Sequence, residues 1–429
     1  MRRDFLKLCG LAGLSFAFPG TKSLFAADTK ETPPYDGPFY VVFNASGGWD
    51  TTYLMDPKGI NEINRLYKEG DILTKGQHKF APTAPQVKPG AGAMSNEDFY
   101  KELGDELLVL NGLDYSVNNH SPGARYMATG KLDSMAYPTF AALVAACKGP
   151  TCPLSFLTFG NYSATGNIVA MSRVPYLPSL QRIANADAID GNSHSPYHDD
   201  FALSRIEQAL QDENNSRGAQ VRLPRQERAE NMLYAAQVNS KALQRITPFI
   251  PKNSPKERLS QQAEIALASF KAGVCVSANI SIGQFDSHAN NDVDQMKLIP
   301  EFLAGITYLL RRAEELKIRE KMVIVIQSEM GRTPNYNKGN GKDHWSIGSI
   351  MFLGPKIKGN RVLGATDEKQ FQVPLNPQTL VCDKEKGIRV RPEHIHTALR
   401  QYAGIADHPL AKKFPLGVTD AELLQGLWG

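Results

Sequence analysis

The stretch Lys321-Met-Val-Ile-Val-Ile-Gln327 is a continuous apolar run bounded by polar residues. Runs of this kind form parallel strands that are buried on both faces. A second run, Pro38-Phe-Tyr-Val-Val-Phe-Asn44, leads into the glycines Gly47 and Gly48, as expected of a strand followed by a turn. These two segments predict the centre of a sheet that is covered by helices.

Other segments extend this sheet on either side of the two central runs. Further strands are predicted at 106–111, 274–282 and 350–353, and helices at 137–147, 261–271, 298–316 and 393–402. Strands that alternate with helices are typical of a doubly wound α/β fold with a mostly parallel sheet. Residues 185–255 differ, because they are polar and charged with helical patterns at 200–212 and 225–243. We interpret this part as a helical insertion or cap.

The N-terminus has the layout of a signal peptide. Arg2 and Arg3 precede an apolar run at 8–18, and Ala26-Ala27 offers a cleavage site. The paired arginines resemble the twin-arginine signal, which predicts the Tat translocase as a partner during export and a periplasmic or secreted protein spanning 28–429. The apolar run is shorter than the ~20 residues that a membrane span needs, so no stable span is expected after cleavage.

Composition narrows the function classes. The apolar fraction of 42% and the charged fraction of 21% are those of a soluble globular protein. The net charge of +4 is spread over 429 residues, and no basic block is interleaved with aromatic residues, which argues against a nucleic-acid partner. Cys147 and Cys152 suit a disulfide in an oxidising compartment better than a zinc site, since no second pair of ligands lies nearby in the sequence.

Four motifs that could carry chemistry each follow a predicted strand. They are Ser46-Gly-Gly-Trp-Asp50, Asn119-His-Ser-Pro-Gly-Ala-Arg125, Gln284-Phe-Asp-Ser-His288 and Ser328-Glu-Met-Gly-Arg332, the last continuing to Gly341-Lys-Asp-His-Trp345. Ligands of open α/β sheets bind at the carboxyl ends of the strands. These motifs are therefore expected to meet at one edge of the sheet.

The acidic and histidine side chains of these motifs indicate a metal site. The predicted ligands are Asp50, Asp286, His288, Glu329, Asp343 and His344. Carboxylates and imidazoles together suit Zn²⁺, Mn²⁺ or a similar divalent ion, and the ion removes the repulsion between clustered carboxylates. Any one of these residues is as readily a loop cap or a surface histidine, so the prediction depends on their combination.

The Gly-Gly-Trp-Asp, Phe-Asp-Ser-His-Ala-Asn, Glu-Met-Gly-Arg-Thr-Pro and Gly-Lys-Asp-His-Trp motifs resemble the bacterial domain-of-unknown-function 1501 family over almost the whole mature chain. That family is similar to the alkaline phosphatase and sulfatase superfamily. The resemblance implies a three-layer α/β/α sandwich with one or two divalent ions, which would be Zn, Mn, Ca or Mg. It implies that Asp50 and Glu329 hold one ion and that Asp286, His288 and His344 hold a second.

The resemblance also implies a function. A residue of the loop that holds His120 and Ser121 would be the nucleophile, and Arg125 and Arg332 would bind the oxygens of a phosphate or sulfate ester. Either arginine is equally readable as a structural ion-pair partner. The leading hypothesis is an exported metal-dependent hydrolase of small-molecule or glycan esters. The alternatives are a catalytically inactive periplasmic binding or assembly protein with the same fold, and a metal-dependent mutase or phosphotransferase.

Overall fold

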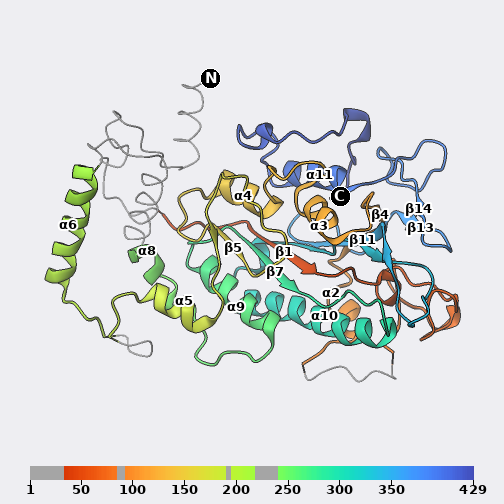
Figure 1. Cartoon of the computed structure of the whole chain (residues 1–429), viewed down its shortest axis with the longest axis horizontal. Helices are drawn as coiled ribbons and strands as arrows, with labels where there is room; N and C mark the ends of the chain where they lie inside the picture. The colour runs from red at the N-terminus through yellow and green to blue at the C-terminus, as the bar shows by residue number, and fades with distance from the viewer. Residues whose placement is uncertain (1–32, 85–91, 190–194, 218–239) are drawn as a thin grey trace.

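A computed structural model describes residues 33–84, 92–189, 195–217 and 240–429 of the chain. Eight strands form the main sheet in the order β12-β4-β11-β8-β1-β7-β5-β6 (Figure 1). They are β1 (Phe39–Ala45), β4 (Leu108–Asp114), β5 (Phe156–Thr158), β6 (Met171–Ser172), β7 (Ser277–Ile282), β8 (Met322–Gln327), β11 (Ile347–Leu353) and β12 (Arg361–Leu363). All neighbours pair in parallel except β11, which is antiparallel to β4 and β8. The predicted mostly parallel sheet is confirmed.

The two central strands are buried along their whole length. In β1, Phe39, Val41 and Phe43 pack into one hydrophobic core, while Tyr40 and Val42 pack into a second core on the opposite face. Alternate side chains of a strand point to opposite faces, so a strand between two cores has no polar face. This explains the continuous apolar runs in the sequence.

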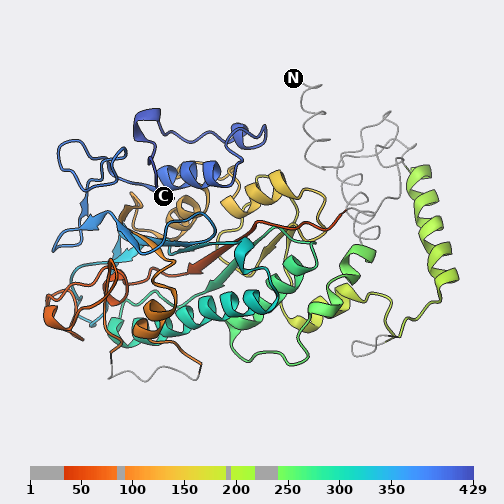
Figure 2. The same ribbon diagram turned by 180° about the vertical axis from the view of Figure 1, so that it is seen from behind.

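Helices cover both faces of the sheet and make the fold a three-layer α/β/α sandwich, as predicted. Figures 1 and 2 show α3, α4 and α11 on one face, and α2, α9 and α10 on the other. Their bounds are α2 (Asn96–Leu103), α3 (His120–Thr129), α4 (Phe140–Lys148), α9 (Arg258–Lys271), α10 (Asn291–Glu315) and α11 (Pro392–Tyr402).

Several helix starts differ from the sequence prediction, those of α4 and α10 among them. Helix α4 begins at Phe140 because the Thr139 side chain caps it by accepting a hydrogen bond from the backbone N–H of Ala142 (3.2 Å). Helix α10 begins at Asn291, earlier than predicted. Its first turn contains Asp292 and Asp294, whose negative charges are favourable at the positive end of the helix dipole. These polar residues interrupt the apolar periodicity by which the start of the helix was predicted.

Smaller elements complete the fold. They are α5 (Leu177–Ala184), α6 (Asp200–Arg217), α8 (Ser240–Gln244) and the strand pairs β2 (Leu73–Lys75) with β3 (His78–Phe80), β9 (Gly331–Arg332) with β10 (His344–Trp345), and β13 (Ala365–Thr366) with β14 (Gln372–Val373). The described part of the predicted insertion is helical, and α6 stands away from the sheet in Figures 1 and 2. The predicted signal peptide and most of the predicted helix at 225–243 lie outside the described residues.

The predicted disulfide is wrong, because Cys147 and Cys152 are free thiols. The sequence suggested one tight loop, whereas α4 extends through Cys147 to Lys148 and holds that side chain against the hydrophobic core. Burial raises the pKa of Cys147 to about 12 and that of Cys152 to about 11, so both thiols stay protonated at neutral pH. In the ranges that the structure describes, none of the helices is both apolar enough and long enough for a bilayer.

Candidate metal centre

Four loops meet at the carboxyl ends of the central strands, as the sequence predicts. The loop after β1 carries Gly47 and Asp50, the loop after β7 carries Asp286 and His288, and Glu329 follows β8. The β9–β10 hairpin adds Asp343 and His344, and α3 begins with His120. Close backbone contact joins these loops: a Cβ at Gly47, where φ is +120°, would lie 2.6 Å from the backbone nitrogen of Asp286.

Three histidines converge on the carboxylate of Asp286. The Nε2 atom of His120 lies 3.2 Å from Oδ2, and the Nε2 atoms of His288 and His344 lie 3.0 and 3.2 Å from Oδ1. The Nε2 atoms of His288 and His344 are themselves 3.0 Å apart. We call His120, Asp286, His288 and His344 the His/Asp cluster.

Each histidine of the His/Asp cluster is held through its other ring nitrogen. The Nδ1 acceptors are Glu329 Oε1 for His120 (3.1 Å), Asp343 Oδ1 for His288 (3.0 Å) and the backbone carbonyl of Asn118 for His344 (2.9 Å). An Nδ1–H that donates to such an acceptor leaves Nε2 deprotonated and free to bind a metal. All three rings thus present the same atom to Asp286.

The donor set fits a divalent metal ion. Ligand atoms ~2.05 Å from one tetrahedral zinc ion lie ~3.3 Å apart, close to the 3.0–3.2 Å separations among Asp286 Oδ1 and the Nε2 atoms of His288 and His344. The Nε2 atom of His120 is shielded from solvent and makes no hydrogen bond with the described residues. Imidazole nitrogens with a carboxylate are ligands for Zn²⁺ or Mn²⁺. One ligand atom from each of His120, Asp286 and His344 lies within 4.8 Å of the others.

Charge at the centre is set by Arg332 and Glu329. Burial acts to raise the pKa of Asp286, but the hydrogen bond and positive charge of Arg332 outweigh it and lower that pKa to about 2. The hydrogen bond to Glu329 raises the pKa of His120. Asp286 is therefore a carboxylate at neutral pH and is ready to bind a cation.

The two arginines predicted to bind an ester are both engaged with the protein. Arg332 is buried and donates to Asp286 Oδ1 (2.7 Å) and to the backbone carbonyls of Gly47, Gly48 and Lys342. The Nε atom of Arg125 donates to the carbonyl of Leu132 (2.8 Å), in the turn after α3. Arg332 positions Asp286, and no contact in the described structure joins Arg125 to the His/Asp cluster.

Asp50, Glu329 and Asp343 are not brought into the cluster as ligands. Asp50 is buried and bonded to Thr52, Asn291 and Lys342. Glu329 accepts the backbone N–H of Gly47 (2.7 Å) and holds His120, while Asp343 holds His288. The structure thus places these three carboxylates beside the His/Asp cluster, where two of them hold its histidines.

Ser121 is next to His120 in the first turn of α3. The Asn119 side chain caps this helix by accepting the backbone N–H of Ser121 (3.3 Å). The side chain of Ser121 is exposed, and its hydroxyl makes no hydrogen bond within the described residues. Its hydroxyl is therefore exposed at the N-terminal end of α3.

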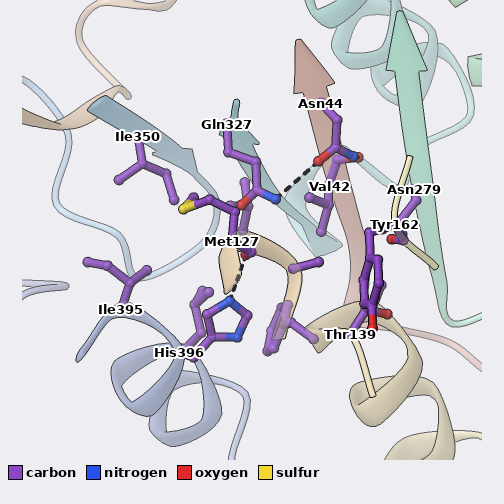
Figure 3. Close-up of a pocket in the computed structure, with 15 residues that line it drawn as sticks. Val42, Asn44, Met127, Thr139, Tyr162, Asn279, Gln327, Ile350, Ile395 and His396 are labelled. Atoms are coloured by element: carbon purple, nitrogen blue, oxygen red, sulfur yellow. Dashed lines mark hydrogen bonds between the residues drawn. The ribbon is translucent and has the colours of Figure 1, made fainter. Parts of the chain in front are cut away.

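The internal cavity shown in Figure 3 lies between the sheet and helices α3, α4 and α11. Asn44 and Gln327, joined by a hydrogen bond (3.1 Å), face it from the strands, and His396 faces it from α11. Its volume of about 10 Å³ has room for one water molecule, far below the ~300 Å³ of a typical ligand site. This cavity is therefore too small to be a ligand site.

Comparison with solved structures returns several proteins, among them sulfatases. A structure of Ps i-CgsB has a TM-score of 0.41 at 9% identity and covers 86% of this chain and 72% of its own. PsFucS1 sulfatase from Pseudoalteromonas sp. has a TM-score of 0.38 at 10% identity, with 91% and 73% covered. BT1596, a 2-O GAG sulfatase, has a TM-score of 0.34 at 10% identity, with 87% and 72% covered. These likenesses are weak, so the fold assignment rests on the sheet of this chain.

Comparison with curated proteins finds no match. The profile of a family described as "Protein of unknown function (DUF1501)" matches residues 40–383. The match runs from β1 to beyond β14 and contains all four residues of the His/Asp cluster. The family suggested by the sequence motifs is thus confirmed, and the chain belongs to the DUF1501 family.

Proposed function

We propose that this protein is an exported metal-dependent hydrolase of phosphate or sulfate esters. The supporting observation is the convergence of three Nε2 atoms on the Asp286 carboxylate, with every Nδ1 atom fixed by a separate acceptor. A supporting acceptor behind each histidine is the usual arrangement around protein-bound metal ions. Histidines that served only to stabilise the loops would not need their free nitrogens to face one carboxylate.

The residues of the His/Asp cluster would hold the ion, and the ion would polarise an ester oxygen and make an oxygen nucleophile more reactive. Other residues of the chain would hold the ligands of this ion in place. Arg332 fixes the Asp286 carboxylate from the buried side, and Glu329 fixes the His120 ring. Because these supports are in place before a substrate arrives, little rearrangement is needed during the reaction.

Helix α3 supports an anionic substrate. His120 is its first residue, so the positive end of the helix dipole lies beside the His/Asp cluster. The Ser121 hydroxyl is exposed at the same helix end and is the side chain that we assign as nucleophile. A phosphate or sulfate ester would bring its negative charge to this end and its ester bond next to Ser121.

Export by the twin-arginine route remains part of the proposal. It is supported by Arg2-Arg3 and the short apolar run behind them. This route carries folded proteins, which agrees with a site whose ligands come from loops far apart in the sequence. We expect the folded protein to act in the periplasm or outside the cell.

Elemental analysis and activity on one preparation test the proposal. The full chain is stripped with chelator, incubated separately with Zn²⁺, Mn²⁺, Ca²⁺ and Mg²⁺, and assayed on 4-nitrophenyl phosphate and 4-nitrophenyl sulfate. We expect one of these ions to be retained and to restore ester cleavage. The double substitution Asp286→Asn/His344→Gln should abolish both. The matched control is His408→Gln, a histidine of the C-terminal segment whose Nδ1 accepts the backbone N–H of Leu410 (3.2 Å).

If the purified chain retains no divalent ion and cleaves neither ester, the hydrolase proposal is wrong. One observation favours a second candidate, an inactive binding protein that keeps the metal: the two arginines expected to hold an ester are already engaged elsewhere. Metal retention without turnover, unchanged by Ser121→Ala, would favour this second candidate.

A further inference from the structure

Behind the His/Asp cluster lies a second charged pair that is fully buried. The Nζ atom of Lys342 is 2.6 Å from Oδ2 of Asp50, and both side chains have 0% exposure. A lysine buried to this degree is rare unless its charge is paired. The pair is therefore a built feature of the fold, and Asp50 is the residue that was expected to bind a metal.

The carboxylate of Asp50 has no free bonding position. Its Oδ1 atom accepts the backbone N–H of Thr52 (3.1 Å) and the hydroxyl of the same residue (2.6 Å). Its Oδ2 atom accepts the Asn291 amide (3.0 Å) in addition to Lys342. A carboxylate has about four acceptor positions, so this one is saturated. A metal ion could bind Asp50 only by displacing these donors.

The positive charge of Lys342 is supported from the other side by aromatic rings. Its Nζ atom lies 5.4 Å from the centre of the Tyr53 ring and 5.2 Å from that of Tyr336. Rings within about 6 Å attract a cation through their electron-rich faces. A divalent ion placed here would meet an ammonium group in a buried region, where like charges repel strongly.

The backbone of Lys342 joins the two loops that carry the predicted ligands. Its N–H donates to the carbonyl of Ser287 (3.0 Å), between Asp286 and His288. Its carbonyl accepts from Arg332 (3.0 Å), which in turn holds Asp286. The buried pair thus anchors both loops to the end of β1.

We propose that Lys342 takes the place of a second metal ion, so that the centre holds one divalent ion and Asp50 is a structural counter-charge. The resemblance of the sequence to two-metal enzymes implied an ion shared by Asp50 and Glu329. In the structure Asp50 pairs with Lys342, while Glu329 holds His120 and the Gly47 N–H. The inference rests on the metal centre of the proposed function and fixes its stoichiometry.

The first test is the number of ions bound by the wild-type full chain. The chelator-stripped protein is titrated with Zn²⁺ by calorimetry, and its content is measured by elemental analysis after dialysis. We expect one tightly bound ion per chain. Two ions would overturn the inference but leave the hydrolase proposal standing. No bound ion would overturn the metal centre and both proposals with it.

The second test removes the buried pair. Asp50→Asn/Lys342→Met eliminates both charges together and should still bind one ion, with affinity changed by no more than about tenfold because only loop anchoring is altered. Lys342→Met alone leaves a buried carboxylate without a counter-charge and should melt below the double variant. The matched control is Asp407→Asn/Lys412→Met at an exposed ion pair.

Loss of the bound ion from a folded double variant would show that Asp50 is a ligand and would overturn the inference. A single variant that melts no lower than the double variant would show that Lys342 is not the counter-charge. If the variants do not fold, the wild-type stoichiometry still decides between one ion and two.

Discussion

The substitution Asp343→Ala tests whether the residues behind the histidines tune metal binding. Asp343 accepts a hydrogen bond from Nδ1 of His288 (3.0 Å) and another from the Asn337 amide (3.1 Å). Loss of such a supporting acceptor weakens metal binding by about 10–100-fold, which corresponds to about 1.4–2.8 kcal/mol. The side chain is 58% exposed, so the metal-free protein should lose less than about 1 kcal/mol of unfolding free energy.

The measurement is a Zn²⁺ competition titration against a chelating dye, together with urea unfolding of the metal-free protein. Asp407→Ala is the control, because it removes an exposed carboxylate that pairs with Lys412 (3.0 Å) instead of supporting a histidine. We expect Zn²⁺ to bind more weakly to Asp343→Ala than to the wild type, and the control variant to bind it as the wild type does. The urea midpoint should be unchanged in both variants. Equal Zn²⁺ affinity in the wild type and both variants would refute the supporting role of Asp343.

Two further predictions follow from buried groups. Burial lowers the pKa of His396 to about 4 from its ordinary value of 6.5, so the unfolded chain binds a proton that the folded chain does not. The free energy of unfolding should therefore fall as the pH decreases from about 6.5 to about 4, and this residue should account for about 2 kcal/mol of the loss at pH 5. Urea unfolding of His396→Gln should lack that part of the decrease. A pH profile of His396→Gln identical to that of the wild type would contradict the lowered pKa of His396. Gly341→Ala should lower the melting temperature and the Zn²⁺ affinity, because a Cβ there would overlap the backbone of His288. Gly70→Ala, with open space around it, should change neither. Equal behaviour of the two variants would show that the loops of Gly341 and His288 can separate freely.

Much of the fold could be predicted because burial leaves a direct trace in the sequence. β1 and β8 lie between two cores and therefore read as unbroken apolar runs. β11 was predicted too short, since Gly348 and Ser349 interrupt its apolar pattern. The Ser349 hydroxyl is satisfied by Asn111 of the neighbouring strand (2.7 Å), a partner that no local pattern could indicate.

The sequence could predict which loops lie together at the candidate site, but not which of their side chains face its centre and which support it. The rule that parallel strands present their carboxyl ends to one edge was enough to bring Asp286, His288 and His344 together. It could not show that Lys342 is buried against Asp50, since lysine is normally exposed and only the tertiary structure reveals the pair. The sequence left the nucleophile open between His120 and Ser121, because the contact that turns His120 toward Asp286 comes from Glu329, which is distant in the sequence.

The loops of the His/Asp cluster have a consequence for the order of events during folding. The hydrogen bond that fixes His120 spans 209 residues, and the bond that fixes His344 spans 226. Contacts of such long range form late, because the entropic cost of closing a large loop comes before the contacts can stabilise the chain. A ribosome-bound fragment that ends before β10 lacks one histidine of the centre altogether. In the proposed metal centre, the ion would therefore bind only after β10 is in place, and its binding energy would stabilise only the completed chain.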